Sequence, residues 1–172
     1  YLAARAFGYQ AIITYQATRY SASIIFPEHA FIIRLCGPLQ TVLTGSIGFG
    51  LLRYFRNDFR RKENLQFWQW LLVFFALFWL RQVFNILAAC LEYLNTGSYP
   101  TGTDEVLLAA YLHLPPLGLE LPLAVFGFLI VLNVFFTCVP AQQCLTFLLA
   151  AFVGGLSGFN LWMYLLGPVL LP

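Results

Sequence analysis

Three polar residues, Arg81, Asn85 and Glu92, stand at intervals of four and seven in a mainly apolar stretch. At about 100° per residue, these spacings place the three side chains on one stripe of a helix. Ionisable groups are costly among apolar helices and usually face the interior of a bundle. The stripe is therefore expected either to line a polar cavity and support a site, or to be satisfied internally, with Arg81 paired and Asn85 bonded across helices.

A second candidate is Asp104, in the polar segment GSYPTGTDEVLLAAYL. Its carboxylate has the chemistry of a metal ligand, placed at the start of a short helix. The alternative is a structural role, in which Thr103 or Asp104 caps that helix. In that case Glu105 is favoured in the first turn by the helix dipole.

The two histidines, His29 and His113, each lie beside the end of an apolar run. Imidazole ligates metals and tetrapyrroles, but the separation of these two residues gives no ligand spacing. Ordinary histidines at a membrane interface are the alternative. The four cysteines form no C-x-x-C pair, so small apolar helix residues are expected rather than a disulfide framework or a cysteine metal site.

The elements that must position these residues follow from composition. The chain is 60% hydrophobic and 9% charged, whereas soluble domains carry roughly 25% charged residues. Lipid must therefore solvate much of its surface, and we expect an all-α polytopic membrane protein with one membrane domain over residues 1–172. The predicted elements are a helix tail at 1–7, a short interfacial β-hairpin at 9–26, and transmembrane helices at 30–54, 67–94, 123–139 and 144–166.

Two local patterns refine the spans. Gly37-Pro38 is expected to kink or break the first span. Gly154 and Gly158, four residues apart in the last span, are typical of close helix packing.

Charge predicts the topology. Five of the nine basic residues fall in one loop: Arg53, Arg56, Arg60, Arg61 and Lys62. This is a membrane topology signal and not a nucleic-acid surface, which would need more basic groups outside the membrane. By the positive-inside rule the 53–63 loop is predicted to be cytoplasmic. Two antiparallel spans would then return Asp104 to the membrane face at which Tyr1 lies.

Several segments, in their order along residues 1–115, resemble the site-2-protease family of intramembrane zinc metalloproteases. In that family a helix bearing H-E-x-x-H continues with small and apolar residues, often an arginine, and then glycine; YLAARAFGYQ looks like that continuation. A hairpin commonly follows, and then a span opening with a Gly-Pro signature, to which RLCGPLQTVLTG is similar. FNILAACLEYL followed by GTDEVLLAAYLHLP looks like the family's asparagine and aspartate segments, with Asn85 and Asp104 at the matching places.

The resemblance implies a zinc site with two histidines and a distant carboxylate, here Asp104 as third ligand, with the glutamate of H-E-x-x-H as general base. The substrate would be a membrane-embedded peptide. H-E-x-x-H is not in this sequence and would have to precede Tyr1, so no catalytic residue is expected within the chain. Since the only methionine is Met163, we expect that the N-terminus was removed or that the sequence is a fragment.

The sequence departs from the family in two places. It has Asn85-Ile-Leu-Ala88 where the family has Asn-x-x-Pro, and Asp104-Glu105 where the family has Asp-Gly. The predicted orientation also places Asp104 away from the cytoplasm, whereas the family usually cuts near the cytoplasmic side. A degenerate, non-proteolytic relative would be consistent with these departures.

The alternative expectation is a non-catalytic structural subunit of a larger membrane complex. Aromatic residues make up 18% of the chain, and such helices can pack lipids, quinones, carotenoid pigments or neighbouring subunits. A transporter is a third option, although the four spans contain no internal repeat. In every case the lipid bilayer is the expected partner, and nucleic acid is not.

Overall fold

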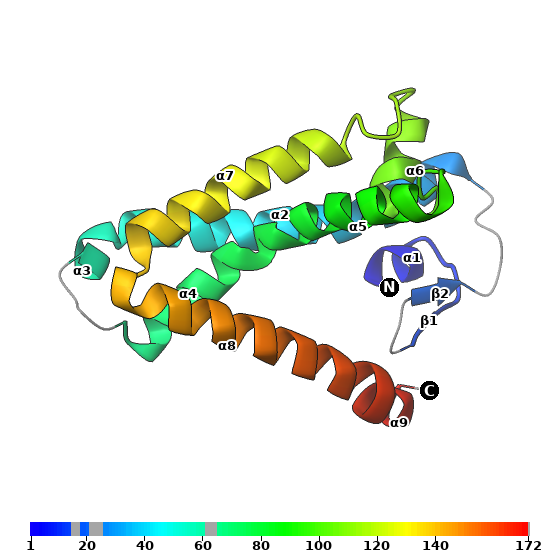
Figure 1. Cartoon of the computed structure of the whole chain (residues 1–172). Helices are drawn as coiled ribbons and strands as arrows, with labels where there is room; N and C mark the ends of the chain where they lie inside the picture. The colour runs from blue at the N-terminus through cyan, green and yellow to red at the C-terminus, as the bar shows by residue number, and fades with distance from the viewer. Residues whose placement is uncertain (15–17, 21–25, 61–64, 172) are drawn as a thin grey trace. The chain divides into compact units, whose positions relative to one another are not determined.

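Four long apolar helical stretches dominate the structure, a computed structural model that describes residues 1–14, 18–20, 26–60 and 65–171 (Figure 1). Each is long and apolar enough to cross a membrane, and each coincides with a predicted span. Their bounds are Pro27–Tyr54, Phe67–Thr96, Leu117–Cys138 and Ala141–Leu170. An all-α polytopic fold is therefore confirmed, and the chain has the character of an integral membrane protein.

The chain begins with a short helix, α1 (Leu2–Ala6), followed by two short strands. Gly8 has a φ of +80°, a left-handed conformation that glycine adopts without strain, so the helix ends where the sequence predicts. Strands β1 (Ala11–Ile13) and β2 (Thr18–Tyr20) pair antiparallel, with Ile12 opposite Arg19. The rest of the predicted hairpin includes 15–17 and 21–25, which lie outside the described residues.

The first membrane helix, α2 (Pro27–Tyr54), runs through Pro38 without the break that Gly37-Pro38 could have produced. Proline inside a helix removes one main-chain donor, which would otherwise bond the carbonyl four residues earlier, at Arg34. The Gly37 carbonyl, next to Pro38, accepts hydrogen bonds from side chains of α2 and α5, as described below. A short helix, α3 (Arg56–Arg60), follows α2.

The second membrane helix is divided. Helix α4 (Phe67–Ala76) is followed by a tighter 3₁₀ turn, Leu77–Trp79, and then by α5 (Leu80–Thr96). At its start, the side chain of Gln69 accepts a hydrogen bond from the main-chain N–H of Gln66 at 2.8 Å. The sequence predicted one continuous helix here, since the apolar run shows no helix breaker at 77–79.

The remaining helices are α6 (Asp104–Tyr111), α7 (Glu120–Cys138), α8 (Ala141–Asn160) and, after a π-helical turn at Leu161–Leu166, α9 (Gly167–Leu170). Helix α6 is the short helix predicted between the second and third spans. Of the two predicted caps, Thr103 is the one formed, because its Oγ1 accepts a hydrogen bond from the Val106 N–H at 3.4 Å.

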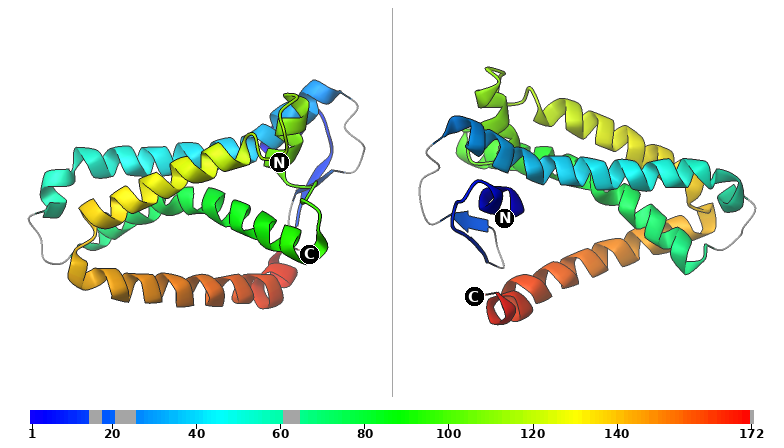
Figure 2. Two further views of the ribbon diagram at one scale, coloured as in Figure 1. Left: turned by 45° about the horizontal axis from the view of Figure 1, so that its top comes forward. Right: turned by 180° about the vertical axis from the view of Figure 1, so that it is seen from behind.

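The described residues divide into two compact units, one of Tyr1–Ile33 with Gln142–Pro172 and one of Arg34–Ala141. The single membrane domain stays a prediction, as does the shared membrane face of Tyr1 and Asp104, which belong to different units. Within the second unit, α5 packs along α7, and α2 lies antiparallel to α4 and α5 (Figure 2).

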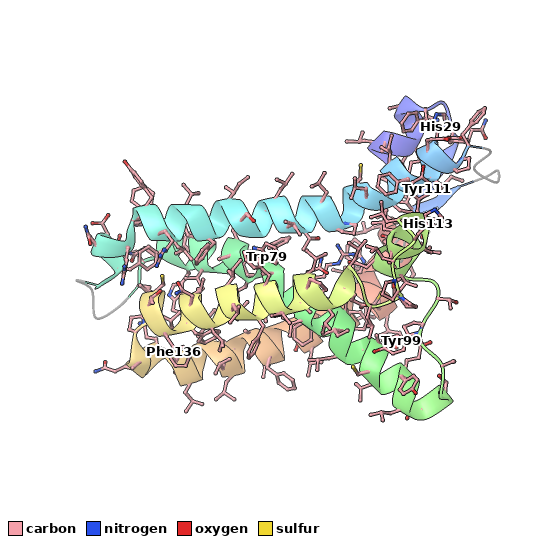
Figure 3. The ribbon with its side chains drawn as sticks, turned by 90° about the horizontal axis from the view of Figure 1, so that it is seen from above. His29, Trp79, Tyr99, Tyr111, His113 and Phe136 are labelled. Carbon is pink, nitrogen blue, oxygen red and sulfur yellow. The ribbon has the colours of Figure 1, made fainter. Side chains whose placement is uncertain are left out.

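Trp79 forms the centre of the second unit and is only 2% exposed. Its side chain lies between α2 and α7 (Figure 3). A Cβ added to Gly45 would stand 2.5 Å from Trp79 Cδ1, and one added to Gly127 would stand 2.8 Å from the Trp79 carbonyl oxygen. Glycine at both positions therefore allows the indole to fit between two helices.

Candidate functional site

A polar network begins at Arg81, half a turn beyond Trp79 on the same helical stretch. Arg81 Nη1 donates to the Gly37 carbonyl oxygen at 3.2 Å and to Thr41 Oγ1 at 2.6 Å. Thr41 is buried, and its hydroxyl in turn donates to the Gly37 carbonyl at 3.2 Å. These bonds tie α5 to the first half of α2.

The same arginine reaches α6 through Glu105. Glu105 Oε1 accepts a hydrogen bond from Asn85 Nδ2 at 3.1 Å and lies 4.0 Å from Arg81 Nη2. The glutamate side chain is 2% exposed and that of Arg81 is 41% exposed. A buried carboxylate needs such partners, because an isolated charge away from water is costly. The network therefore fixes the first turn of α6 against α5.

Asp104 is the residue immediately before Glu105, and its carboxylate lies against α2. A Cβ added to Gly37 would stand 3.2 Å from Asp104 Oδ2, so the glycine leaves room for the carboxylate. Burial raises the pKa of Asp104 above the ordinary carboxyl value, and the negative charge of Glu105 raises it further. The positive charges of Arg81 and Arg34 act in the opposite direction.

Two buried polar residues near this end of the unit were not predicted. Glu120, at the start of α7, is fully buried, and neither of its carboxyl oxygens has a hydrogen-bond partner among the described residues. It lies within electrostatic range of Glu105. Gln82 on α5 is also fully buried, with neither amide atom bonded to a described residue. The only sequence signal for Glu120 was a single acid at the head of an apolar run.

The predicted stripe is brought together only in part. Arg81 and Asn85 meet on the carboxylate of Glu105. The Glu92 side chain is exposed, and the main-chain carbonyl of Glu92 accepts a hydrogen bond from Thr96 Oγ1 at 2.8 Å. Glu92 lies nearly two helical turns beyond Asn85 on α5. Glu105 takes the place that the sequence pattern suggested for Glu92.

The other predicted sites lie elsewhere. His29 stacks on Phe7 with ring centroids 4.1 Å apart, and its Nδ1 lies 3.0 Å from the Tyr9 hydroxyl. His113 is exposed at the end of α6 with a φ of +56°. A Cβ added to Gly154 or Gly158 would meet no described atom within 4 Å, so their role in helix packing stays a prediction.

Among residues 1–14, 18–20, 26–60 and 65–171, no group of three or more His, Cys, Asp or Glu side chains could hold a metal ion. The four cysteines are free thiols and form no disulfide. Asp104 is thus one well-placed carboxylate and not a complete ligand set.

Comparison of the chain with protein-family models, with curated proteins and with solved structures found no match. Among the described residues, four helices have membrane-spanning length and composition, and one end of the second unit carries a network of Arg81, Asn85 and Glu105 beside Asp104.

Proposed function

We propose that this integral membrane protein acts as an intramembrane metalloprotease similar to the site-2-protease family, with Asp104 as one zinc ligand. The observation that carries the proposal is the position of Asp104 Oδ2 against Gly37 of the Gly37-Pro38 pair. These are the two segments, far apart in the sequence, that resemble the family's Gly-Pro span and its aspartate ligand. Their proximity was not required by their spacing along the chain.

The surroundings of Asp104 suit a ligand that must be held still. Thr103 caps the helix on one side of Asp104, and Glu105 on the other side is bound by α5. Ligand side chains work best when neighbouring hydrogen bonds restrict their orientation. In this proposal Arg81 and Asn85 are positioning residues, which act on Asp104 through Glu105.

The described residues alone do not complete a zinc site. A catalytic zinc needs about three protein ligands and an open position, and Asp104 provides one. A helix with H-E-x-x-H, outside the sequence described here, would have to provide two histidines and the general base. When bound, zinc would supply an activated water for attack on a peptide bond. Hydrolysis therefore belongs only to a protein that includes such a helix.

Zinc content tests the proposal directly. The full-length protein, as its gene encodes it, is purified in neutral detergent, and bound zinc is measured by mass spectrometry. We expect about one zinc per chain, lost in Asp104→Asn and retained in Asp58→Asn, which removes an exposed carboxylate in α3. Cleavage of a membrane-embedded peptide reporter should follow the same order.

Two results would overturn the proposal. One is wild-type protein without zinc that co-purifies stably with other membrane subunits, which would favour a structural subunit. The other is equal zinc in Asp104→Asn and wild type, which would remove Asp104 from the ligand set.

A further inference from the structure

The end of the second unit opposite the polar network is basic and aromatic, and it carries an inference that does not rest on the proposed function. This basic end comprises Arg53 in the last turn of α2, Arg56 at the start of α3, and the aromatic residues around Trp68 at the start of α4. In the sequence, Arg60, Arg61 and Lys62 lie between Arg56 and Trp68. With Asp58 and Glu63 included, residues 53–63 carry a net charge of +3.

Aromatic rings form a platform at this end. Trp68 makes edge-to-face contacts with Phe55 and Phe59, at centroid separations of 5.7 and 6.0 Å. Tyr54 contacts Phe55 in the same way and is 82% exposed. Tryptophan and tyrosine are enriched at the level of lipid headgroups, because one part of the side chain is apolar and the other polar. The platform therefore marks a headgroup boundary.

Arg53 and Arg56 differ in how exposed their side chains are. Arg53 is exposed, and its guanidinium carbon lies 5.9 Å from the centre of the Phe49 ring. Arg56 is half-buried, and its Nε is buried without a hydrogen-bond acceptor among the described residues. A guanidinium is suited to phosphate because its planar set of donors matches the phosphate oxygens. No ion pair with a described carboxylate neutralises either arginine.

The adjoining surface is apolar. On α4, next to the platform, Phe67, Leu71 and Phe74 are exposed, with Phe67 exposed by 78%. A phospholipid matches this surface, because its anionic headgroup is joined to two hydrocarbon chains. Figures 1 and 2 show α3 at the same end as the start of α4 and the end of α7, away from α6.

We propose that the basic end binds the headgroup phosphate of an anionic phospholipid, with Arg53 and Arg56 as its ligands and the exposed face of α4 against its acyl chains. The occupant is a lipid and not a free anion, because the apolar face lies directly beside the charged one. A net-neutral lipid such as phosphatidylcholine would gain little from the charge.

The test is lipid binding by the purified full-length protein in neutral detergent, followed by native mass spectrometry with phosphatidylglycerol or phosphatidylcholine. Each basic residue near an anionic surface contributes roughly fivefold in affinity. We expect Arg53→Gln and Arg56→Gln each to weaken phosphatidylglycerol binding by about that factor, and Asp58→Asn to strengthen it. Arg5→Gln, the same change at an exposed residue of α1, should leave binding unchanged.

Three outcomes would overturn the inference. They are equal binding of the two lipids by wild type, equal loss in Arg5→Gln and Arg53→Gln, and competition by inorganic phosphate at concentrations equal to those of the lipid. The last result would show a site for free anions. Thermal unfolding of each variant without added lipid identifies any misfolded variant, and Asp58→Asn keeps the test decisive because its expected effect is a gain.

Discussion

Two neighbouring regions of the second unit hold its second membrane helix against other helices by opposite means. Around Trp79 the contacts are dry, and Gly45 and Gly127 let α2 and α7 approach the indole. Two residues further along, Arg81 forms hydrogen bonds and a long ion pair with α2 and α6. The junction at Trp79 depends on shape, whereas the network at Arg81 depends on charge and direction.

The use of both close packing and hydrogen bonds reflects the lipid that surrounds the helices. In lipid, burying an apolar side chain between helices gains little, because hydrocarbon surrounds it in either case. Close packing of small residues and hydrogen bonds between helices remain as the specific forces. Close packing restricts how near two helices can lie, and hydrogen bonds select which residues face each other. We expect the two regions to fail differently when they are altered.

We expect the largest loss of stability from a methyl group added where the helices pack through apolar contacts. Gly48→Ala would place a Cβ 2.5 Å from the main-chain nitrogen of Ala76, and a backbone atom cannot move aside as a side-chain end can. Overpacking of this kind typically costs about 1–3 kcal/mol and can cost more. We expect a loss of about 3 kcal/mol in the free energy of unfolding, measured by steric trapping in detergent.

Gly50→Ala is the matched control, two residues away on the same helix, where an added Cβ meets nothing within 4 Å. Alanine in a helix interior is favoured over glycine by roughly 0.5–1 kcal/mol, so this variant should be neutral or slightly more stable. Equal losses in both variants would show that the helix approach at Gly48 is not a close one.

A smaller effect is expected in the polar region. Arg81→Leu leaves Glu105 buried with Asn85 as its one remaining partner among the described residues, and we expect a loss of about 1–2 kcal/mol. The loss should be moderate because the arginine is partly exposed and its ion pair is long. In a Glu105→Gln background the penalty should fall, since no buried charge remains. An unchanged penalty in the double-mutant cycle would show that Arg81 and Glu105 do not interact.

The smallest predicted effect is a dependence of folding stability on pH, caused by the carboxyl group of Asp104. A carboxyl group whose folded pKa is raised binds its proton more tightly in the folded state than in the unfolded state. Stability should therefore decrease as pH rises from the ordinary carboxyl value to the raised value, and should stay constant above it. The amplitude should be small because Asp104 is only half-buried and water screens its charge.

Thermal unfolding of metal-free protein at several pH values measures this dependence, and Asp104→Asn should flatten that part of the curve. A stability that increases with pH over the same range, and loses this increase in Asp104→Asn, would reverse the assigned direction. It would mean that Arg81 and Arg34 outweigh burial at this carboxylate.

The sequence alone determined the helices and their character. Hydropathy and helix length depend on runs of neighbouring residues, so the four spans, the short helix at Asp104 and the paired strands could be predicted without any tertiary contact. The cap at Thr103 was one of two local alternatives, and a single hydrogen bond decided between them. The 3₁₀ turn at Leu77–Trp79 escaped prediction because it coincides with the packing of Trp79 against other helices.

Tertiary structure decided which residues meet. Helical periodicity placed Arg81, Asn85 and Glu92 on one stripe, but it contained no information about the helix that would lie opposite. That helix is α6. It brings Glu105 to the stripe, while the side chain of Glu92 remains exposed. In the same way, Gly48 and Gly50 look alike in the sequence, and only the path of α4 makes one a close contact. Contacts between distant segments depend on the docking of whole helices, and a local pattern specifies a face without specifying its partner.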